Sequence, residues 1–164
     1  MAPGGRAVAY TNGTRVVVHS ATGTKEIAPP DASMSASEPS LSADGRRVAF
    51  TARGAGGATS VYVRDLSTGA TTLVSRASGF TGPPAMGASE HPSLSADGTR
   101  VAFTSDAWNL SPAKCNPARG IFVRDLASGT TTLVSRGDGE NAGLGPTKGS
   151  GSADTMRVRL LCAV

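Results

Sequence analysis

Two long stretches of this 164-residue chain have nearly the same sequence. Four segments of the first copy, at 39–45, 47–51, 63–66 and 71–76, recur in the second copy at 92–98, 100–104, 123–126 and 131–136. The shift is 53 positions for the first two segments and 60 for the others, so the second copy has gained seven residues. All seven lie between Phe103 and Ile121, in one connection, where insertions are tolerated. A repeat of this length limits the fold to stacked copies of one structural unit.

Each copy has the residue pattern of four short β-strands, with β-branched and aromatic runs bounded by turn residues. In the first full copy we predict strands at 39–42, 46–52, 60–65 and 71–76. The turns combine an aspartate, whose carboxylate can accept hydrogen bonds within the turn, with a glycine that can take a positive φ. These predicted structural turn residues are Asp44, Gly45, Asp65, Gly69, Asp97, Gly98, Asp125 and Gly129.

Two incomplete copies flank the full ones. The domain expected over 1–164 therefore consists of a partial blade at 5–28, full blades at 39–76 and 92–136, and the degraded start of a further blade at 150–164. A tight turn at Asn12-Gly13 joins two strands of the first partial blade. Up-and-down four-stranded units are the blades of a β-propeller, and known rings need at least about four of them. The predicted fold is all-β: an incomplete β-propeller of about three four-stranded antiparallel blades, with partial blades at both ends.

The charge pattern argues against nucleic acid as a partner. Sixteen Lys and Arg residues stand against twelve Asp and Glu, a net charge of +4, without a basic cluster interleaved with aromatics. Four arginines recur at matching repeat positions, and we interpret them as solvated surface residues: Arg64, Arg76, Arg124 and Arg136. We predict no transmembrane segment and no signal peptide from the sequence. Cys115 and Cys162 form no metal-binding pattern, so no metal and no cofactor is expected, and whether they pair stays open.

The segments PSLSADGRRVAF, VYVRDL and TTLVSR resemble the TolB-type, WD40-like (PD40) propeller repeat of bacterial proteins. The resemblance covers residues 5 to 136. It implies a rigid binding platform and a periplasmic or extracellular location for the full-length parent protein. The loop at 109–120, NLSPAKCNPARG, lacks the carboxylates that relatives carry there, so the resemblance brings no calcium site to this chain.

No catalytic residue is predicted. The chain has two histidines: His19 falls at a turn, and His91 lies beside Glu90 in a blade-to-blade loop. Because such loops line the faces of a propeller, Glu90 and His91 are the predicted binding residues. Trp108, the only tryptophan, is the third candidate. We expect its ring to pack on its own blade, with an exposed binding anchor as the alternative.

Three functional hypotheses follow. The first is a non-catalytic propeller, not an enzyme, that binds a protein or small ligand through its blade-connecting loops. The second is an accessory propeller of a peptidase or other hydrolase whose catalytic domain lies outside this chain. The third is a truncated gene product without independent function, because both ends fall inside repeats. In each case the open blade edges allow self-association.

Overall fold

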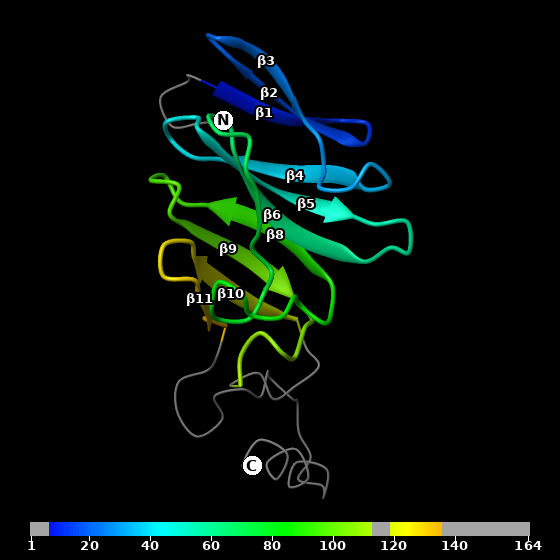
Figure 1. Ribbon diagram of the computed structural model, residues 1–164, viewed down its shortest axis with the longest axis vertical. Helices are drawn as coiled ribbons and strands as arrows, with labels where there is room; N and C mark the ends of the chain where they lie inside the picture. Colours follow the sequence, from blue (N-terminus) through cyan, green and yellow to red (C-terminus); the bar gives the residue numbers. More distant parts are fainter. Residues whose placement is uncertain (1–6, 113–118, 136–164) are drawn as a thin grey trace, which may run out of the picture.

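The computed structural model describes residues 7–112 and 119–135, which form three antiparallel sheets stacked on one another (Figure 1). These residues contain eleven strands and no helix. No helix that could cross a membrane occurs in this part of the chain. The predicted all-β, incomplete propeller is confirmed, since each sheet is a separate blade and the three do not close a ring. The expected blade start at 150–164, and Cys115 and Cys162, lie outside the described residues.

The first sheet has three strands in the order β1-β2-β3. Its strands are β1 (Ala7–Asn12), β2 (Arg15–Ser20) and β3 (Gly23–Ile27). Asn12 pairs with Arg15, so the two-residue turn is Gly13-Thr14, one position later than predicted. Gly13 supplies the positive φ of this turn, at 61°. The hairpin signal therefore located the turn to within one residue.

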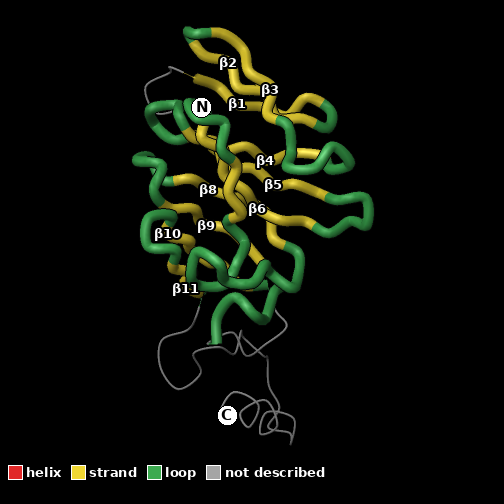
Figure 2. Tube along the Cα trace, in the orientation of Figure 1, coloured by secondary structure: helices red, strands yellow, loops and turns green. Residues whose placement is uncertain are grey.

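The second and third sheets each have four strands that follow one another in chain order (Figure 2). The second sheet contains β4 (Ser35–Leu41), β5 (Arg47–Arg53), β6 (Thr59–Asp65) and β7 (Thr71–Leu73). The third contains β8 (Ser89–Leu94), β9 (Arg100–Ser105), β10 (Gly120–Asp125) and β11 (Thr130–Leu133). Up-and-down connectivity of this kind is that of propeller blades.

Strands β4 and β8, the first of their blades, begin earlier than predicted. Each passes through an irregularity in its pairing with the next strand, between Ser37 and Ser40 in β4 and between Glu90 and Ser93 in β8. A β-bulge accommodates a proline, which has no N–H to donate to the ladder. The prediction that Glu90 and His91 lie in a blade-to-blade loop is therefore wrong. Both residues lie within β8.

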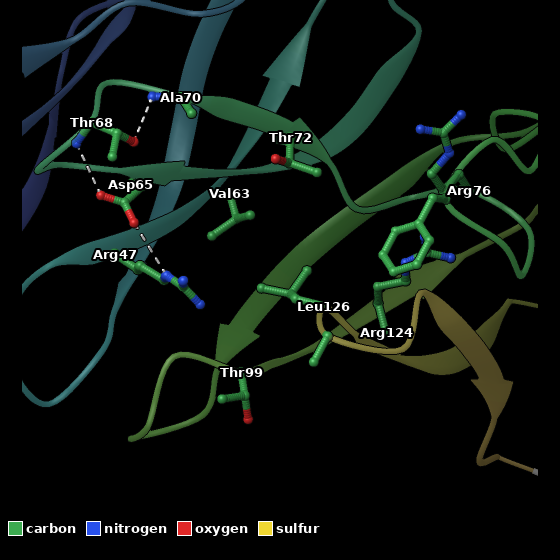
Figure 3. Close-up of a pocket in the computed structure, with 12 residues that line it drawn as sticks. Arg47, Val63, Asp65, Thr68, Ala70, Thr72, Arg76, Thr99, Arg124 and Leu126 are labelled. Carbon is green, nitrogen blue, oxygen red and sulfur yellow. Dashed lines mark hydrogen bonds and ion pairs between the residues drawn. The ribbon is translucent and has the colours of Figure 1, made fainter.

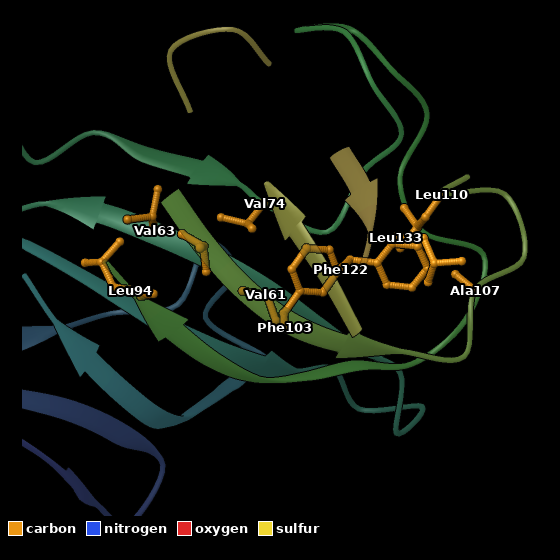
Figure 4. Packing of buried hydrophobic residues seen from close by; sticks show 11 residues of the cluster. Val61, Val63, Val74, Leu94, Phe103, Ala107, Leu110, Phe122 and Leu133 are labelled. Atoms are coloured by element: carbon orange, nitrogen blue, oxygen red, sulfur yellow. The ribbon is translucent and has the colours of Figure 1, made fainter. Parts of the chain in front are cut away.

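Apolar residues from neighbouring sheets interlock in two clusters. One joins Ala7, Val16, Val18 and Ile27 of the first sheet to Val48 and Phe50 of the second, together with Ala36, Leu41 and Ala52. The other joins the second sheet to the third, where the rings of Phe103 and Phe122 stack with centroids 5.7 Å apart (Figure 4). Burial between sheets is thus the main force that holds successive blades together.

Strand β5 belongs to the second sheet, which lies between the first and the third, and its side chains are buried on both faces. Val48 and Phe50 belong to the cluster shared with the first sheet, whereas Ala49 belongs to the cluster shared with the third. A strand covered on both sides has a continuous apolar run instead of alternation, which explains the sequence VAF.

The outer faces of the first and third sheets are open by comparison. Val61 and Val74 of the second sheet are fully buried, whereas their repeat equivalents in the third, Ile121 and Val134, are 46% and 49% exposed. In the same way Tyr10 of the first sheet is 47% exposed, although its equivalent Phe50 is fully buried. The repeat thus places side chains suited to blade packing on surfaces that no described residue covers.

One recurring arginine departs from the predicted surface position. Arg124 is only 4% exposed. Its guanidinium donates from Nη1 to the carbonyl of Ala77 at 2.9 Å and from Nη2 to the carbonyl of Gly79 at 3.0 Å. Arg124 therefore anchors the connection from β7 to β8 on the third sheet, and the surface interpretation is wrong for this residue.

The aspartates of the turns accept several short-range hydrogen bonds. The carboxylate oxygen Oδ1 of Asp97 accepts from the hydroxyl of Ser95 at 2.6 Å and from the amide of Thr99 at 3.0 Å. These bonds, with the hydroxyl of Thr99, lower the pKa of Asp97 to about 2. Asp44, Asp65 and Asp125 accept similar bonds in their turns, and the following glycines, Gly45, Gly69, Gly98 and Gly129, all have positive φ.

Candidate functional site

Glu38 and His91 occupy the same position in two successive blades, 53 residues apart. Each precedes a proline, lies at the irregular point of its strand, and has a positive φ, 53° for Glu38 and 54° for His91. These are the only non-glycine residues with positive φ among those that the structure describes. Such backbone conformations cost free energy and persist where surrounding contacts hold them, often at functional sites.

The side chain of Glu38 reaches across to the next blade. Its Oε2 accepts a hydrogen bond from the amide of His91 at 2.9 Å and from the hydroxyl of Thr51 at 2.7 Å. Its Oε1 lies 3.3 Å from His91 Nε2. Burial by itself would raise the pKa of Glu38, but the hydrogen bonds from His91 and Thr51 and the charges of His91 and Arg53 outweigh it, so the pKa is lowered. Glu38 is therefore held as a carboxylate between two blades.

Glu90 links the same two blades through a second set of contacts. Its Oε1 accepts from Arg53 Nη2 at 3.3 Å and from the hydroxyl of Thr59 at 3.2 Å, both in the second sheet. Its Oε2 accepts from Arg119 Nη1 at 3.1 Å, in the third. With a side-chain exposure of 17%, Glu90 is the most shielded acid in these ion pairs. It occupies the space between two arginines from different blades.

Arg119 is also bound to Asp106. Its Nε and Nη2 lie 3.1 Å and 3.3 Å from the two carboxylate oxygens of Asp106, a two-point contact that fixes the guanidinium plane. The hydrogen bond and charge of Asp106, and then those of Glu90, raise the pKa of Arg119. Together Glu38, Arg53, Glu90, His91 and Arg119 form what we call the cross-blade cluster.

An exposed apolar pair lies on the loops beside this cluster. Trp108, two residues after Asp106, is 64% exposed, and Met86 in the connection from β7 to β8 is 65% exposed. The side chain of Asn109 joins the two loops, since it accepts from the amide of Met86 at 2.8 Å and donates to the carbonyl of Pro84 at 2.8 Å. The expectation that Trp108 packs on its own blade is wrong, because its side chain is exposed. Its role as a binding anchor stays a prediction.

The contacts of His91 do not form a hydrolytic set. Nδ1 of His91 lies 3.2 Å from the hydroxyl of Thr104, and Nε2 faces Glu38. However, the Thr104 hydroxyl donates to the carbonyl of Glu90 at 3.1 Å, so its proton is directed away from the imidazole. No group of three metal-ligating side chains occurs within residues 7–112 and 119–135. The cluster offers both signs of charge to a bound partner.

Two of the three predicted binding residues, Glu90 and His91, belong to the cross-blade cluster, and Trp108 lies on the loop after β9. Sequence reasoning missed Glu38, Arg53 and Arg119. Glu38 carried a usable signal, because it is the repeat equivalent of His91 and also precedes a proline. The arginines carried none, since their partner Glu90 is 37 and 29 residues away in the sequence.

Comparison with known proteins identifies the fold. No protein-family model matches the chain, and no curated protein is similar in sequence. Among solved structures, TolB from Acinetobacter baumannii matches with 22% identity and a TM-score of 0.52, covering 78% of this chain and 29% of that one. The putative TolB from Agrobacterium tumefaciens matches with 12% identity and a TM-score of 0.53, and the match covers 80% of this chain and 46% of the Agrobacterium chain.

These likenesses show the fold alone, because both identities are low. The chain spans about a third and about half of the length of the two TolB structures. The propeller repeat expected from PSLSADG, VRDL and TTLVSR is thus confirmed at the level of the fold. The chain has the fold of part of a TolB-like β-propeller.

Proposed function

We propose that this chain is a non-catalytic binding segment of a propeller, and that it holds an extended protein segment at the end of the blades that carries the cross-blade cluster, Trp108 and Met86. The observation that carries the proposal is the meeting of Glu38 and His91, two residues with positive φ from successive blades. Their contacts fix a surface at the junction of the blades, and preorganised surfaces lose little entropy on binding.

The composition of this surface supports a protein ligand. Tryptophan and arginine are the residues most often found to dominate binding energy at protein interfaces. Trp108 and Met86 supply exposed apolar area, while Arg53 and His91, with side chains 55% and 59% exposed, supply polar contacts beside it. The proposed surface includes residues of β4 and β8, the first strands of two blades, as well as loops. It therefore differs from the binding site expected from the sequence, which used the blade-connecting loops alone.

A displayed library of random peptides, selected on the intact chain, tests the proposal. Selected peptides should bind Trp108→Ala at least about 30-fold more weakly, since truncation of a hot-spot aromatic costs about 2 kcal/mol or more. Arg15→Ala is the control, because Arg15 is an exposed residue of the first sheet that belongs to neither proposed binding surface. Peptides that bind both variants as tightly as the parent chain would contradict the proposed site.

Self-association is a second candidate, supported by the exposed blade faces. A second copy that placed Val8 and Tyr10 against Ile121 and Val134 would repeat the packing between the chain's own blades. Such head-to-tail contacts use different surfaces on the two copies. The partner proposed for these faces is thus another blade of the same type.

The accessory-propeller alternative makes a separate prediction: the complete reading frame should encode a catalytic domain beside the blades. Because the chain spans only part of the TolB structures, sequencing of the locus on both sides is the direct test. A cooperative thermal transition of the chain by itself would count against a product without independent function.

A further inference from the structure

A pocket of about 470 Å³ opens between the second and third sheets (Figure 3). It lies beside the turns that follow β6 and β8, at the end of the blades opposite to the cross-blade cluster. It is lined by the last residues of β6, the turns at Thr68 and Thr99, and the start of the connection after β7. All of its lining residues belong to these two sheets and their connections, within the described part of the chain. Its volume lies in the range of small-molecule sites, roughly 300–1,000 Å³.

The lining of the pocket carries an excess of positive charge. Arg47, Arg76 and Arg124 line it against a single carboxylate, that of Asp65. That carboxylate forms an ion pair with Arg47, whose Nε lies 3.5 Å from Asp65 Oδ2. Neither Arg76 nor Arg124 forms an ion pair with any carboxylate of the described residues. In Figure 3 these two arginines lie at one end of the pocket and Arg47 with Asp65 at the other.

Arg124 is affected both by its burial and by the charge of Arg76. Burial lowers the pKa of Arg124, and the positive charge of Arg76 lowers it further. Backbone carbonyls supply hydrogen bonds to both: Arg76 Nε donates to Gly82 at 2.9 Å, and Arg124 donates to Ala77 and Gly79. Carbonyl dipoles orient a guanidinium without neutralising it. An anion between the two arginines would offset both the desolvation and the repulsion.

The remaining walls suit an apolar body next to the charged head. Val63 and Leu126 lie between the two ends of the pocket (Figure 3). Phe80 also lines it and is 65% exposed. Its position is fixed by the packing of its loop, since Gly79 donates to the carbonyl of Gly129 at 2.8 Å and a Cβ on Gly129 would lie 3.2 Å from the Phe80 ring. A bound ligand would cover an aromatic ring that is otherwise in water.

We infer that this inter-blade pocket binds a small organic anion, in which a carboxylate or phosphate head meets Arg76 beside Arg124 and an apolar body lies against Val63, Leu126 and Phe80. Planar guanidinium groups recognise both kinds of head through paired N–H donors. The site is separate from the proposed protein-binding surface, because it lies at the other end of the blades.

Benzoate and phenyl phosphate are suitable probes, each titrated into the isotope-labelled full chain and followed by NMR. We expect saturable shifts of the amides of Val63, Phe80 and Leu126 with both probes. Neutral benzamide, which has the ring without the charge, should bind at least about tenfold more weakly, since hydrogen bonds to charged groups contribute roughly 1.5–3 kcal/mol. Inorganic phosphate, which has the charge without the ring, should also bind more weakly than phenyl phosphate.

Arg76→Gln should weaken benzoate binding about tenfold, whereas Arg15→Gln, which removes the same charge from the first sheet outside the pocket, should leave it unchanged. Phe80→Ala provides a second variant that changes a mostly exposed side chain, and it should weaken binding several-fold.

The inference is overturned if benzoate produces no saturable shift at the amides of Val63, Phe80 and Leu126. It is also overturned if benzamide binds as well as benzoate, if inorganic phosphate binds as well as phenyl phosphate, or if Arg76→Gln and Arg15→Gln bind benzoate equally. Peptide binding at Trp108 should be the same in the Arg76 variant, so the two proposals fail independently.

Discussion

The carboxylate of Glu38 accepts a hydrogen bond at 2.9 Å from the backbone amide of His91, the residue that occupies its own position in the next blade. One repeat position thus contacts its successor directly. The side chain of one blade holds the backbone of the following blade at the point where that backbone takes a positive φ. The junction between these blades is therefore polar at this end and apolar between the sheets.

Glu38→Ala should lower the free energy of unfolding by about 1 to 2 kcal/mol, because it leaves the amide of His91 and the hydroxyl of Thr51 without their acceptor. Urea denaturation at neutral pH measures the change. Glu26→Ala is the control: Glu26 is 60% exposed and lies 3.9 Å from Arg15, so its loss should cost less than about 0.5 kcal/mol. Equal losses in the two variants would show that the contact between blades contributes nothing to stability.

His91→Gly should be more stable than His91→Ala by about 0.5 to 1 kcal/mol, because glycine adopts a φ of 54° without steric cost. This order is the reverse of that expected in a regular strand. At Thr132, an exposed position of β11 outside the positive-φ residues, glycine should be less stable than alanine by a similar amount. Thermal unfolding of the four variants gives both differences, and the same order at both positions would argue against strain at His91.

Acid should destabilise the chain below about pH 4, through the turn aspartates. The folded pKa of Asp97 is about 2, below its ordinary value of 3.8. A lowered folded pKa stabilises the folded state above the unfolded pKa, and this contribution is lost as the pH falls from about 3.8 through about 2. Asp97→Asn should therefore be less stable than the parent at neutral pH, with a shallower loss of stability in this window. Parallel stability curves for the two proteins would disprove the assignment.

Arg124→Gln should cost about 2 to 4 kcal/mol of stability, because two carbonyls of the blade connection and the hydroxyl of Thr131 lose a buried donor. Arg64→Gln changes the equivalent residue of the second sheet, whose Nη1 donates only to Thr71 among the described residues. Its cost should be about 1 kcal/mol or less. Chemical denaturation of both variants makes the comparison, and similar costs would indicate that burial of Arg124 has no consequence.

Sedimentation velocity over a range of concentrations tests the exposed blade face. If the chain associates through Ile121 and Val134, Ile121→Lys should raise the concentration needed for association by about tenfold. The reason is that a charge placed at an apolar contact loses its hydration. Met86→Lys adds the same charge at a residue that is 65% exposed and lies away from this face, so it should leave the distribution unchanged. A parent chain that is monomeric at all concentrations would rule out this assembly.

The sequence and the structure agree where local chemistry decides the outcome. Asp97 and Gly98 specify their turn within four residues, and the repeat shows that the same turn occurs in each full blade. The candidate site was only partly predictable. The sequence predicts Glu90 and His91 as a pair in a loop, whereas both lie within β8, whose pairing with β9 is irregular between Glu90 and Ser93. Their arginine partners come from other parts of the chain.

By itself, the sequence determined the all-β blades, their order and their turns, because these depend on residues close together in the chain and on the repeat. Only the tertiary structure decided that Glu38 contacts His91 and that Arg124 is buried although Arg64 is not. It also decided that Arg76 and Arg124 line a pocket in which neither arginine is paired with a carboxylate. The physical reason is that equivalent repeat positions have different neighbours. Each blade packs against the next, so the environment of a residue depends on side chains about 50 positions away.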